Sequence, residues 1–257
     1  MLKMKHIATT FLVLLCSLSV LAEDRENINS QAKGTTGFIY GVGLSINEEI
    51  YKGYNRRIMP LPLIGYKGEN LTVYGPFINY NIKDVNNIKL GLSLSPRFQG
   101  FDESDSYIFK GMKDRKNSID AGANISYQNN SWKIALSTMV DALNYSGGYE
   151  LKSTLGYTFR FGAVFVEPSI SISYLDSKHV DYYYGVSDDE MNQDRNAYKG
   201  DKAVNKNIAL SIATPIFFEG LTRFNVGYWQ YDDAITNSPL VKTKNSVNIQ
   251  LFFTKMF

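Results

Sequence analysis

Cysteine and histidine are nearly absent from this sequence of 257 residues, which holds one cysteine and two histidines. Cys16 lies in an N-terminal apolar stretch that we expect to be removed, so the mature chain has no cysteine. This excludes a disulfide framework and a thiolate metal site. Excess charge is also lacking, because losing Lys3 and Lys5 with that stretch lowers the net charge from +2 to 0. A neutral chain gives no support for nucleic-acid binding.

The N-terminal stretch has the order of a secretory signal peptide. Lys3 and Lys5 precede the apolar run IATTFLVLLCSLSVLA, and Val20 and Ala22 occupy the positions that cleavage requires. The apolar core is shorter than the ~20 residues of a spanning helix. A lipoprotein signal is the alternative, but Leu15 is bulky where such cleavage favours a small residue. We predict a signal peptide over residues 1–22, cut after Ala22.

No later segment approaches a transmembrane helix in length and apolarity. What the sequence does contain is alternation with a period of two, as in residues 37–46, where apolar side chains alternate with small or polar ones. This period is typical of strands with one apolar face. The pattern recurs in residues 88–95, 118–127, 132–141, 149–160, 164–174, 206–214, 222–231 and 246–257.

Strand length and aromatic placement favour a membrane barrel. The segments run to ~10–12 residues, as crossing a bilayer at a tilt requires, whereas the strands of a sandwich are typically ~5–6 residues long. Aromatic residues flank the apolar faces as a girdle would: Tyr40, Tyr66, Tyr80, Tyr127, Trp132, Tyr149, Tyr157, Tyr174, Tyr228 and Trp229. A secreted β-sandwich with an aromatic core is the alternative interpretation.

The connections indicate barrel topology as well. Short links at 67–70, 128–131 and 161–162 contrast with long polar ones at 98–117, 175–204 and 232–245. We predict an all-β, transmembrane, antiparallel up-and-down β-barrel. Eleven clear segments and the rule of even strand number give about 12 strands, with ten as the fallback. The alternation is irregular in residues 47–82, where Gly75–Pro76 shifts the phase as a bulge would. The predicted organisation is a signal peptide (1–22), a periplasmic tail (23–36) and the barrel (37–257).

Two prolines stand on alternate residues of one apolar run, at Pro60 and Pro62. Amides two residues apart in a strand point to the same neighbour, so both prolines remove donors on one side only. We predict a local seam there, meaning a bulge, a strand end or a stretch lifted off one neighbour, with Arg56 and Arg57 at the rim. Alternatively, 57–63 is a rim or plug segment. These four residues are candidates for partner binding or gating.

Two loops carry residue types that chemistry uses. Asp102, Glu103 and Asp105 offer oxygen ligands for a divalent cation, but the spacing lacks the turn glycine and distal glutamate of a calcium loop. His179 lies beside Ser177 and acidic neighbours without a Gly-x-Ser-x-Gly elbow. We interpret both as solvated loops, and predict no catalytic residue, metal or cofactor.

The expected lumen face is polar and of mixed charge. Four acids oppose three bases, which predicts internal salt bridges across a filled or narrow interior: Asp120, Asp141, Glu150 and Glu167, with Lys133, Lys152 and Arg160. A large porin would need about 16 strands, which this chain is too short to supply. A narrow channel stays open as an interpretation.

The final strand has alternating apolar residues that include Phe253, and it ends in Phe257, with Lys255 as a departure from the pattern. It resembles the signal that outer-membrane barrels present to the barrel assembly machinery. Arg56-x-x-x-Pro60-Leu61-Pro62, the segment 103–118 and Tyr-Tyr-Tyr-Gly-Val at 182–186 resemble the MipA/OmpV family over essentially the whole mature chain.

The resemblance implies an outer-membrane protein of Gram-negative bacteria, in contact with outer-membrane lipid and lipopolysaccharide. It also implies a non-enzymatic scaffold that joins a murein hydrolase, a lytic transglycosylase, to a murein synthase. Relatives imply two alternatives: a small channel or solute- and drug-responsive barrel, and an adhesin acting through the loop 175–204. No catalytic residues come with the family.

Overall fold

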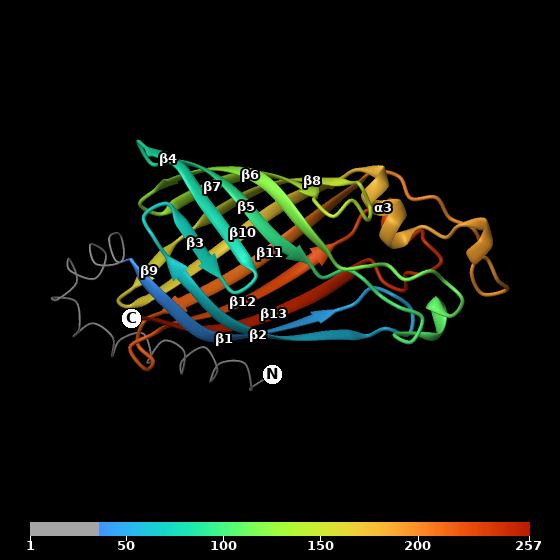
Figure 1. The fold of residues 1–257 in the computed structure, drawn as a ribbon, viewed down its shortest axis with the longest axis horizontal. Helices are drawn as coiled ribbons and strands as arrows, with labels where there is room; N and C mark the ends of the chain where they lie inside the picture. The colour runs from blue at the N-terminus through green and yellow to red at the C-terminus, as the bar shows by residue number, and fades with distance from the viewer. Residues whose placement is uncertain (1–35) are drawn as a thin grey trace, which may run out of the picture.

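The computed structural model describes residues 36–257. The predicted signal peptide (1–22), and the predicted tail except for its last residue, lie outside the described residues. Strands dominate the fold (Figure 1): β1 (Gly37–Glu48), β2 (Arg56–Lys67), β3 (Leu71–Tyr74), β4 (Phe77–Val85), β5 (Ile88–Arg97), β6 (Ser118–Asn129), β7 (Trp132–Asp141), β8 (Tyr149–Tyr157), β9 (Phe159–Phe161), β10 (Val164–Leu175), β11 (Ala203–Thr214), β12 (Leu221–Gln230) and β13 (Asn245–Met256).

The strands form one closed antiparallel sheet. Neighbours in sequence pair with each other, β13 pairs with β1, and β10 pairs with β11 to complete the ring. The three-residue β9 follows β8 directly and pairs with the same neighbour, β10, so the pair supplies one position in the wall. The ring therefore has twelve strand positions, which confirms the predicted fold class and strand number.

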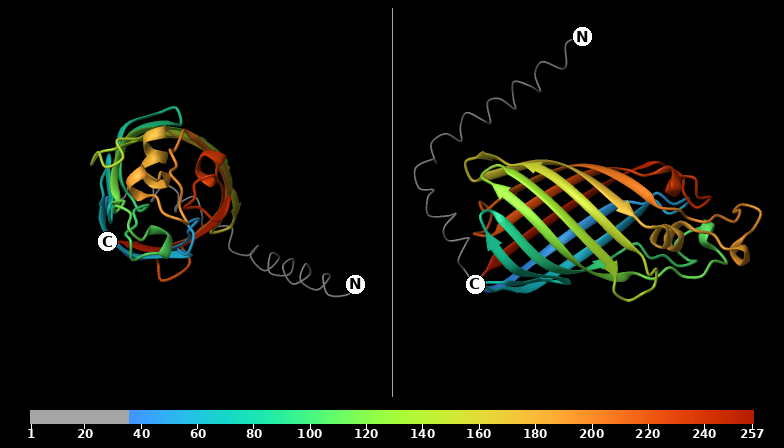
Figure 2. Two further views of the ribbon diagram at one scale, coloured as in Figure 1. Left: turned by 90° about the vertical axis from the view of Figure 1, so that its right-hand side faces the viewer. Right: turned by 90° about the horizontal axis from the view of Figure 1, so that it is seen from above.

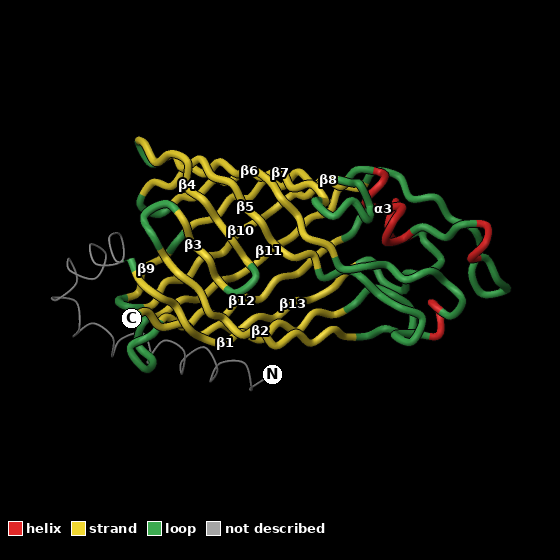
Figure 3. The backbone as a smooth tube through the Cα atoms, viewed as in Figure 1, coloured by secondary structure: helices red, strands yellow, loops and turns green. Residues whose placement is uncertain are grey.

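The two ends of the barrel differ in their connections, as predicted (Figure 3). The turn end holds the start of β1, the chain end at Phe257 and short turns such as 86–87 and 130–131. The loop end holds the long connections 98–117, 176–202 and 231–244. These include the helices α3 (Ser177–Tyr184) and α4 (Asp233–Thr236) and the 3₁₀ turns η2 (Tyr107–Phe109) and η3 (Asp188–Glu190). No helix within 36–257 has the length and apolarity needed to cross a membrane.

The two faces of the wall follow the alternation of each strand. On β1, Phe38, Val42 and Leu44 are exposed on the outer face, whereas Ser45 is buried on the inner face. Trp229 departs from the predicted aromatic girdle, because it faces inward, where Lys152 lies over its ring at 5.2 Å. The preceding residue, Tyr228, is exposed on the outer face, as is Phe224 four residues before it. Alternation counted from Phe224 therefore distinguishes the outward Tyr228 from the inward Trp229.

A short hairpin, β3–β4, interrupts the regularity of the wall. Gly75 and Pro76 form its turn, and Gly75 adopts φ +58°, a conformation that glycine accepts without strain. The bulge expected at these two residues is thus a hairpin turn, and the register shift lies at Asn81/Lys83 of β4. Because β3 has four residues, the hairpin covers only the turn-end part of the wall beside β2.

The hairpin leaves the rest of β2 paired on one side. All twelve residues of β2 pair with β1, but only Gly65, Tyr66 and Lys67 pair with β3. Gly75 donates its N–H to the Ile64 carbonyl at 3.2 Å, so even-numbered residues of β2 direct their backbone groups away from β1. The nitrogens of Pro60 and Pro62 therefore lie on the unpaired side. The predicted stretch lifted off one neighbour is confirmed, and the alternative of a plug segment is wrong, since 56–67 is a strand.

The strand across the opening also carries a proline at its free edge. On β5, Leu94 is the last residue paired with β4, and Pro96 lies opposite Ile119 of β6. The Ile119 carbonyl accepts from Ala142 on the β7 side, so Pro96 directs its nitrogen away from β6. We call the unpaired boundary between residues 56–64 of β2 and 95–97 of β5 the seam. Three prolines without N–H groups lie along it.

Amide hydrogen exchange in detergent micelles tests the seam. We expect the N–H groups of Met59, Leu61 and Leu63 to be protected, because they face β1, and the N–H of Ile58 to exchange at least a hundredfold faster, because it faces the seam. Ile46, the register partner of Ile58 on a strand paired on both sides, is the control. Equal protection of Ile58 and Met59 would show that β2 has a second neighbour.

Candidate functional site

The loop end of the barrel is closed by its own loops. Seen from that end, α3 and the neighbouring loops lie across the mouth of the ring (Figure 2). Their apolar side chains form one buried cluster, which we call the cap: Ile50, Tyr51, Phe101, Ile108, Phe109, Met112, Leu175, Val180, Tyr183, Tyr184, Val186, Ala203, Ile235, Leu240 and Val241. The predicted long polar loops are thus folded together around an apolar core.

Tyr51 lies at the centre of the cap. Its ring centroid is 5.3 Å from that of Phe101, 5.2 Å from Phe109 and 5.5 Å from Tyr184. Its hydroxyl donates to the Tyr183 carbonyl at 3.2 Å, so the buried polar group is satisfied. One side chain from the loop after β1 therefore contacts two other loops.

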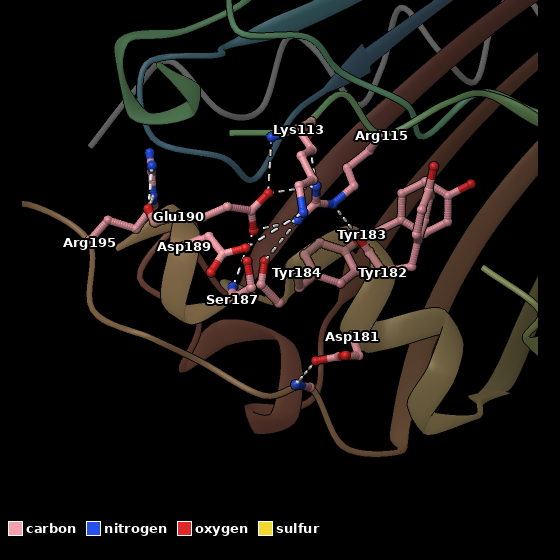
Figure 4. A network of polar contacts seen from close by, with 12 residues as sticks. Lys113, Arg115, Asp181, Tyr182, Tyr183, Tyr184, Ser187, Asp189, Glu190 and Arg195 are labelled. Carbon is pink, nitrogen blue, oxygen red and sulfur yellow. Dashed lines mark hydrogen bonds and ion pairs between the residues drawn. The ribbon is translucent and has the colours of Figure 1, made fainter. Parts of the chain in front are cut away.

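A charged network joins the loop 98–117 to the loop 176–202 (Figure 4). Arg115 donates from Nη1 and Nη2 to the two carboxylate oxygens of Glu190, each at 2.9 Å, and from Nε to the Tyr182 carbonyl at 2.6 Å. Glu190 also accepts from the N–H groups of Lys113 and Ser187. These charge-assisted bonds hold the pKa of Glu190 at about 2, below the usual value of a glutamate, despite the burial of the group.

Arg195 connects the same two loops without a carboxylate. Its buried guanidinium donates to the carbonyls of Glu190, Ile108 and Lys110. Five guanidinium donors can satisfy several carbonyls that an apolar core would leave unpaired. We interpret Arg195 as a structural residue of the cap.

The predicted solvated position of His179 is wrong. The side chain is 2% exposed within the cap, and its Nε2 lies 3.0 Å from Oε1 of Gln99. Burial lowers the pKa of His179 to about 3, so the ring is neutral at pH 7. Asp176 serves as the N-cap of α3 and accepts from the His179 N–H. Asp176 was the sequence signal for this short helix, which the strand periodicity did not indicate.

The acidic loop uses its carboxylates internally. Asp102 accepts from the N–H and hydroxyl of Ser104, Asp105 accepts from the Asp102 N–H, and Glu103 accepts from the Gly111 N–H. The three carboxylates thus bind different partners. Among the described residues, no group of three acidic, histidine or cysteine side chains is placed to hold a metal ion.

Beneath the cap lies a chamber of about 350 Å³. Arg97 and Glu150 line it, and Arg97 forms ion pairs with both Glu150 and Asp120. Of the predicted lumen charges, Lys133 and Glu167 pair at 3.5 Å, whereas Arg97 was not predicted as a partner. Internal salt bridges are therefore present, with Arg97 as their principal base. Arg97 ends β5 directly after a proline, so the alternation of the sequence does not show that its side chain points inward.

A second cavity lies at the seam, and we call it the cleft. Its volume is about 590 Å³, and its lining includes Arg57 and the four residues Ile58–Leu61 of β2. Arg57 pairs with Glu49 at 2.8 Å and donates to the carbonyls of Phe98 and Gly100. The structure therefore places Arg57 and Pro60 in the cleft, with Arg56 and Pro62 next to them on the same strand. Their role in gating or partner binding stays a prediction.

Substitution of Glu190 tests what holds the cap closed. Glu190→Gln leaves Arg115 without its counter-charge, and breaking a buried pair in this way costs on the order of 3 kcal/mol. We expect limited proteolysis to cut loops 98–117 and 176–202 at least tenfold faster while the barrel keeps its heat-dependent electrophoretic migration. Asp189→Asn is the control, because the Asp189 side chain is 82% exposed and its pair with Lys113 is a surface pair. Unchanged cleavage of Glu190→Gln would contradict this account.

Acidification tests the buried histidine. The pKa of His179 is about 3 in the closed cap and near 6.5 in an open one, so protonation favours opening as the pH falls from about 6.5 toward 3. The opening equilibrium, measured by hydrogen exchange of α3 amides, should rise about tenfold per pH unit between 6 and 5. In His179→Gln the opening equilibrium should no longer change between pH 6 and 5. The loss of cap stability caused by protonation of Glu190, whose pKa is lowered in the closed cap, should remain below about pH 4.5. The same slope in the variant would rule out His179 as the cause.

Comparison with known proteins gives a consistent family. The model of the family described as MltA-interacting protein MipA matches residues 40–257. The outer membrane protein Omp26La of Vibrio anguillarum is 29% identical over 208 residues, covering 79% of this chain and 80% of the relative. The MltA-interacting protein of Escherichia coli is 25% identical over 212 residues, covering 79% and 84%.

Among solved structures, the NanC porin aligns over 83% of this chain and 98% of that chain, with 10% identity and a TM-score of 0.45. The putative outer membrane protein YiaT of Escherichia coli is 26% identical over 210 residues, covering 80% of this chain and 85% of the relative. Outer-membrane relatives and a closed barrel together place the protein in the outer membrane. Because the family model spans most of the chain, the protein belongs to the MltA-interacting protein (MipA) family of outer-membrane β-barrels.

Proposed function

We propose that this barrel is a non-enzymatic scaffold that holds a murein hydrolase of the lytic transglycosylase type, together with a murein synthase, at the periplasmic face of the outer membrane. Support comes from family members named MltA-interacting proteins, at 25% identity. In outer-membrane barrels the short turns face the periplasm. The turn end of this chain is then the surface that cell-wall enzymes meet.

One connection at the turn end carries the observation on which the proposal depends. Residues 215–220 expose Ile216, Phe217 and Phe218 by 56%, 53% and 82% (orange, beside the C-terminus in Figure 1). Phe218 and Glu219 both adopt positive φ, and the Gly220 N–H donates to the Phe217 carbonyl at 3.0 Å, so these residues form a tight turn. Glu219 is also held by Lys255 of β13 at 2.8 Å. Three adjacent exposed apolar side chains on a tight turn are typical of an anchor for a protein partner.

The cap counts against a permanently open channel and against a free adhesive loop. Solute flow through the barrel axis would require four of the loop-end connections to separate from the core that they share. Residues 177–184 form α3, and its Val180, Tyr183 and Tyr184 belong to that core, so much of loop 175–204 is committed to packing. The scaffold role depends on neither feature, because it uses the opposite end of the barrel.

Capture of a lytic transglycosylase tests the scaffold. The purified barrel, in detergent, should enrich a lytic transglycosylase and a murein synthase from solubilised envelopes over an unrelated barrel of similar size. Phe217→Ser combined with Phe218→Ser should lower recovery at least tenfold, because the apolar anchors are lost.

Leu143→Ser combined with Tyr145→Ser is the matched control, since these exposed apolar residues lie in a loop-end connection. Heat-dependent migration reports that each variant is folded. No enrichment by the wild-type barrel would contradict the scaffold, and equal recovery by the turn variant would remove residues 215–220 from it.

A further inference from the structure

The cleft passes along the free edge of β2 and touches both faces of the wall. Ile58, Met59, Pro60 and Leu61 all line it, and they are consecutive in the strand. Successive side chains of a strand point to opposite faces, so a cavity that contacts all four must lie at the strand edge. On the outer face, Pro60 lies in register with Leu44, which is exposed in the apolar outer band of β1. The cleft is therefore accessible from the level of the lipid.

The inner side of the same strand is apolar. Leu63 is fully buried, and Leu61 lies beside Gly43 and the inward ring of Phe252. Many inner-face residues elsewhere in the wall are polar, for example Ser173 and Asn207. An apolar strip thus continues from the cleft toward the interior, where a polar lumen would offer no favourable contact to an alkyl chain.

The rim of the cleft has an excess of negative charge. Arg57 and Arg115 line it, but each is matched by a glutamate, Glu49 and Glu190 respectively. The remaining charged groups of the lining are one base and three acids: Lys116, Asp102, Asp105 and Asp114. Such a rim favours a cationic group and disfavours an anionic one.

The open edge also selects for donors. The nitrogen and the carbonyl oxygen of a strand residue point to the same side, so Pro60 and Pro62 direct their carbonyl oxygens across the seam. Neither residue has an N–H. An added β-strand needs both donors and acceptors from the edge it joins, so this edge is a poor template for strand addition. A group that only donates, such as a primary ammonium, matches the carbonyls of Pro60 and Pro62.

We propose that the cleft binds a primary alkylammonium amphiphile that enters sideways from the membrane. Its alkyl chain would lie against Ile58–Leu61, and its ammonium group would lie among the aspartates of the rim. Phe98 lines both the cleft and the chamber beneath the cap. It therefore separates the bound amphiphile from the interior and is the side chain that would have to move for passage into the lumen. This site lies at the loop end and is independent of the proposed scaffold surface.

Photolabelling locates the occupant. The full-length mature barrel, in phospholipid nanodiscs, is exposed to dodecylamine carrying a diazirine on the chain, and the labelled residues are mapped by mass spectrometry. We expect labelling of residues 58–61 and of Phe98 to exceed the average of other outward residues at least fivefold. A dodecyl phosphate probe with the same diazirine should not show this enrichment.

Matched variants separate binding from general lipid contact. Leu61→Trp fills the cleft, and Met59→Trp does so from the neighbouring position if the first variant does not fold. Each should lower labelling at least threefold, whereas Leu136→Trp on the outer face of β7 should not. The double variant Asp105→Asn with Asp114→Asn should also lower labelling. The charge control is Asp194→Asn with Asp201→Asn, which removes two exposed carboxylates outside the cleft.

Three results would overturn the proposal. Even labelling around the barrel would show ordinary lipid contact. Equal enrichment of the phosphate probe would show that the rim does not select a cation. Unchanged labelling in both tryptophan variants would show that the probe lies outside the cleft.

Discussion

Backbone hydrogen bonding is the constraint on which this barrel depends, because a strand in lipid must satisfy its polar groups through its neighbours. Most strands do so on both sides, but at the seam β2 and β5 each lose a partner. Proline reduces that cost, since it has no N–H to satisfy. Pro60, Pro62 and Pro96 all place their nitrogens at this boundary. The opening is therefore encoded in the chain.

The seam and the cap together decide how the interior is reached. The cap closes the axis at the loop end with an apolar core and a charged network around Glu190. The cleft lies below it at the side of the barrel, and Phe98 stands between the cleft and the chamber. A barrel closed at its mouth and interrupted in its wall favours lateral exchange with the membrane. The turn end, with Phe217 and Phe218 exposed, is the surface that the proposed scaffold would use.

Period-two alternation made much of the wall predictable. Residues 132–141 alternate apart from Thr138 and Met139 and form β7 with the same bounds, and the two prolines predict the seam. The four-residue β3 is too short to produce a period, and for this reason the sequence predicts a bulge where the structure has a hairpin beside the seam. The cap was not predictable, because its core joins loops that are far apart in sequence, and His179 therefore appeared solvated. Arg97 was not predicted as a lumen base because it follows Pro96 at the very end of its strand, beyond the residues whose alternation is clear.

Disulfide trapping tests the interrupted wall most directly, and the predicted mature chain has no cysteine to interfere. Ile46 and Ile58 are register partners across β1 and β2, in a pair that does not exchange hydrogen bonds, so their Cα atoms lie at about 4.5 Å, within disulfide range. Cysteines at these two positions should crosslink rapidly in membranes. Cysteine at Ile58 with cysteine at Leu94 or Pro96, across the seam, should stay reduced. Equally fast crosslinking across the seam would show a closed wall and contradict the account.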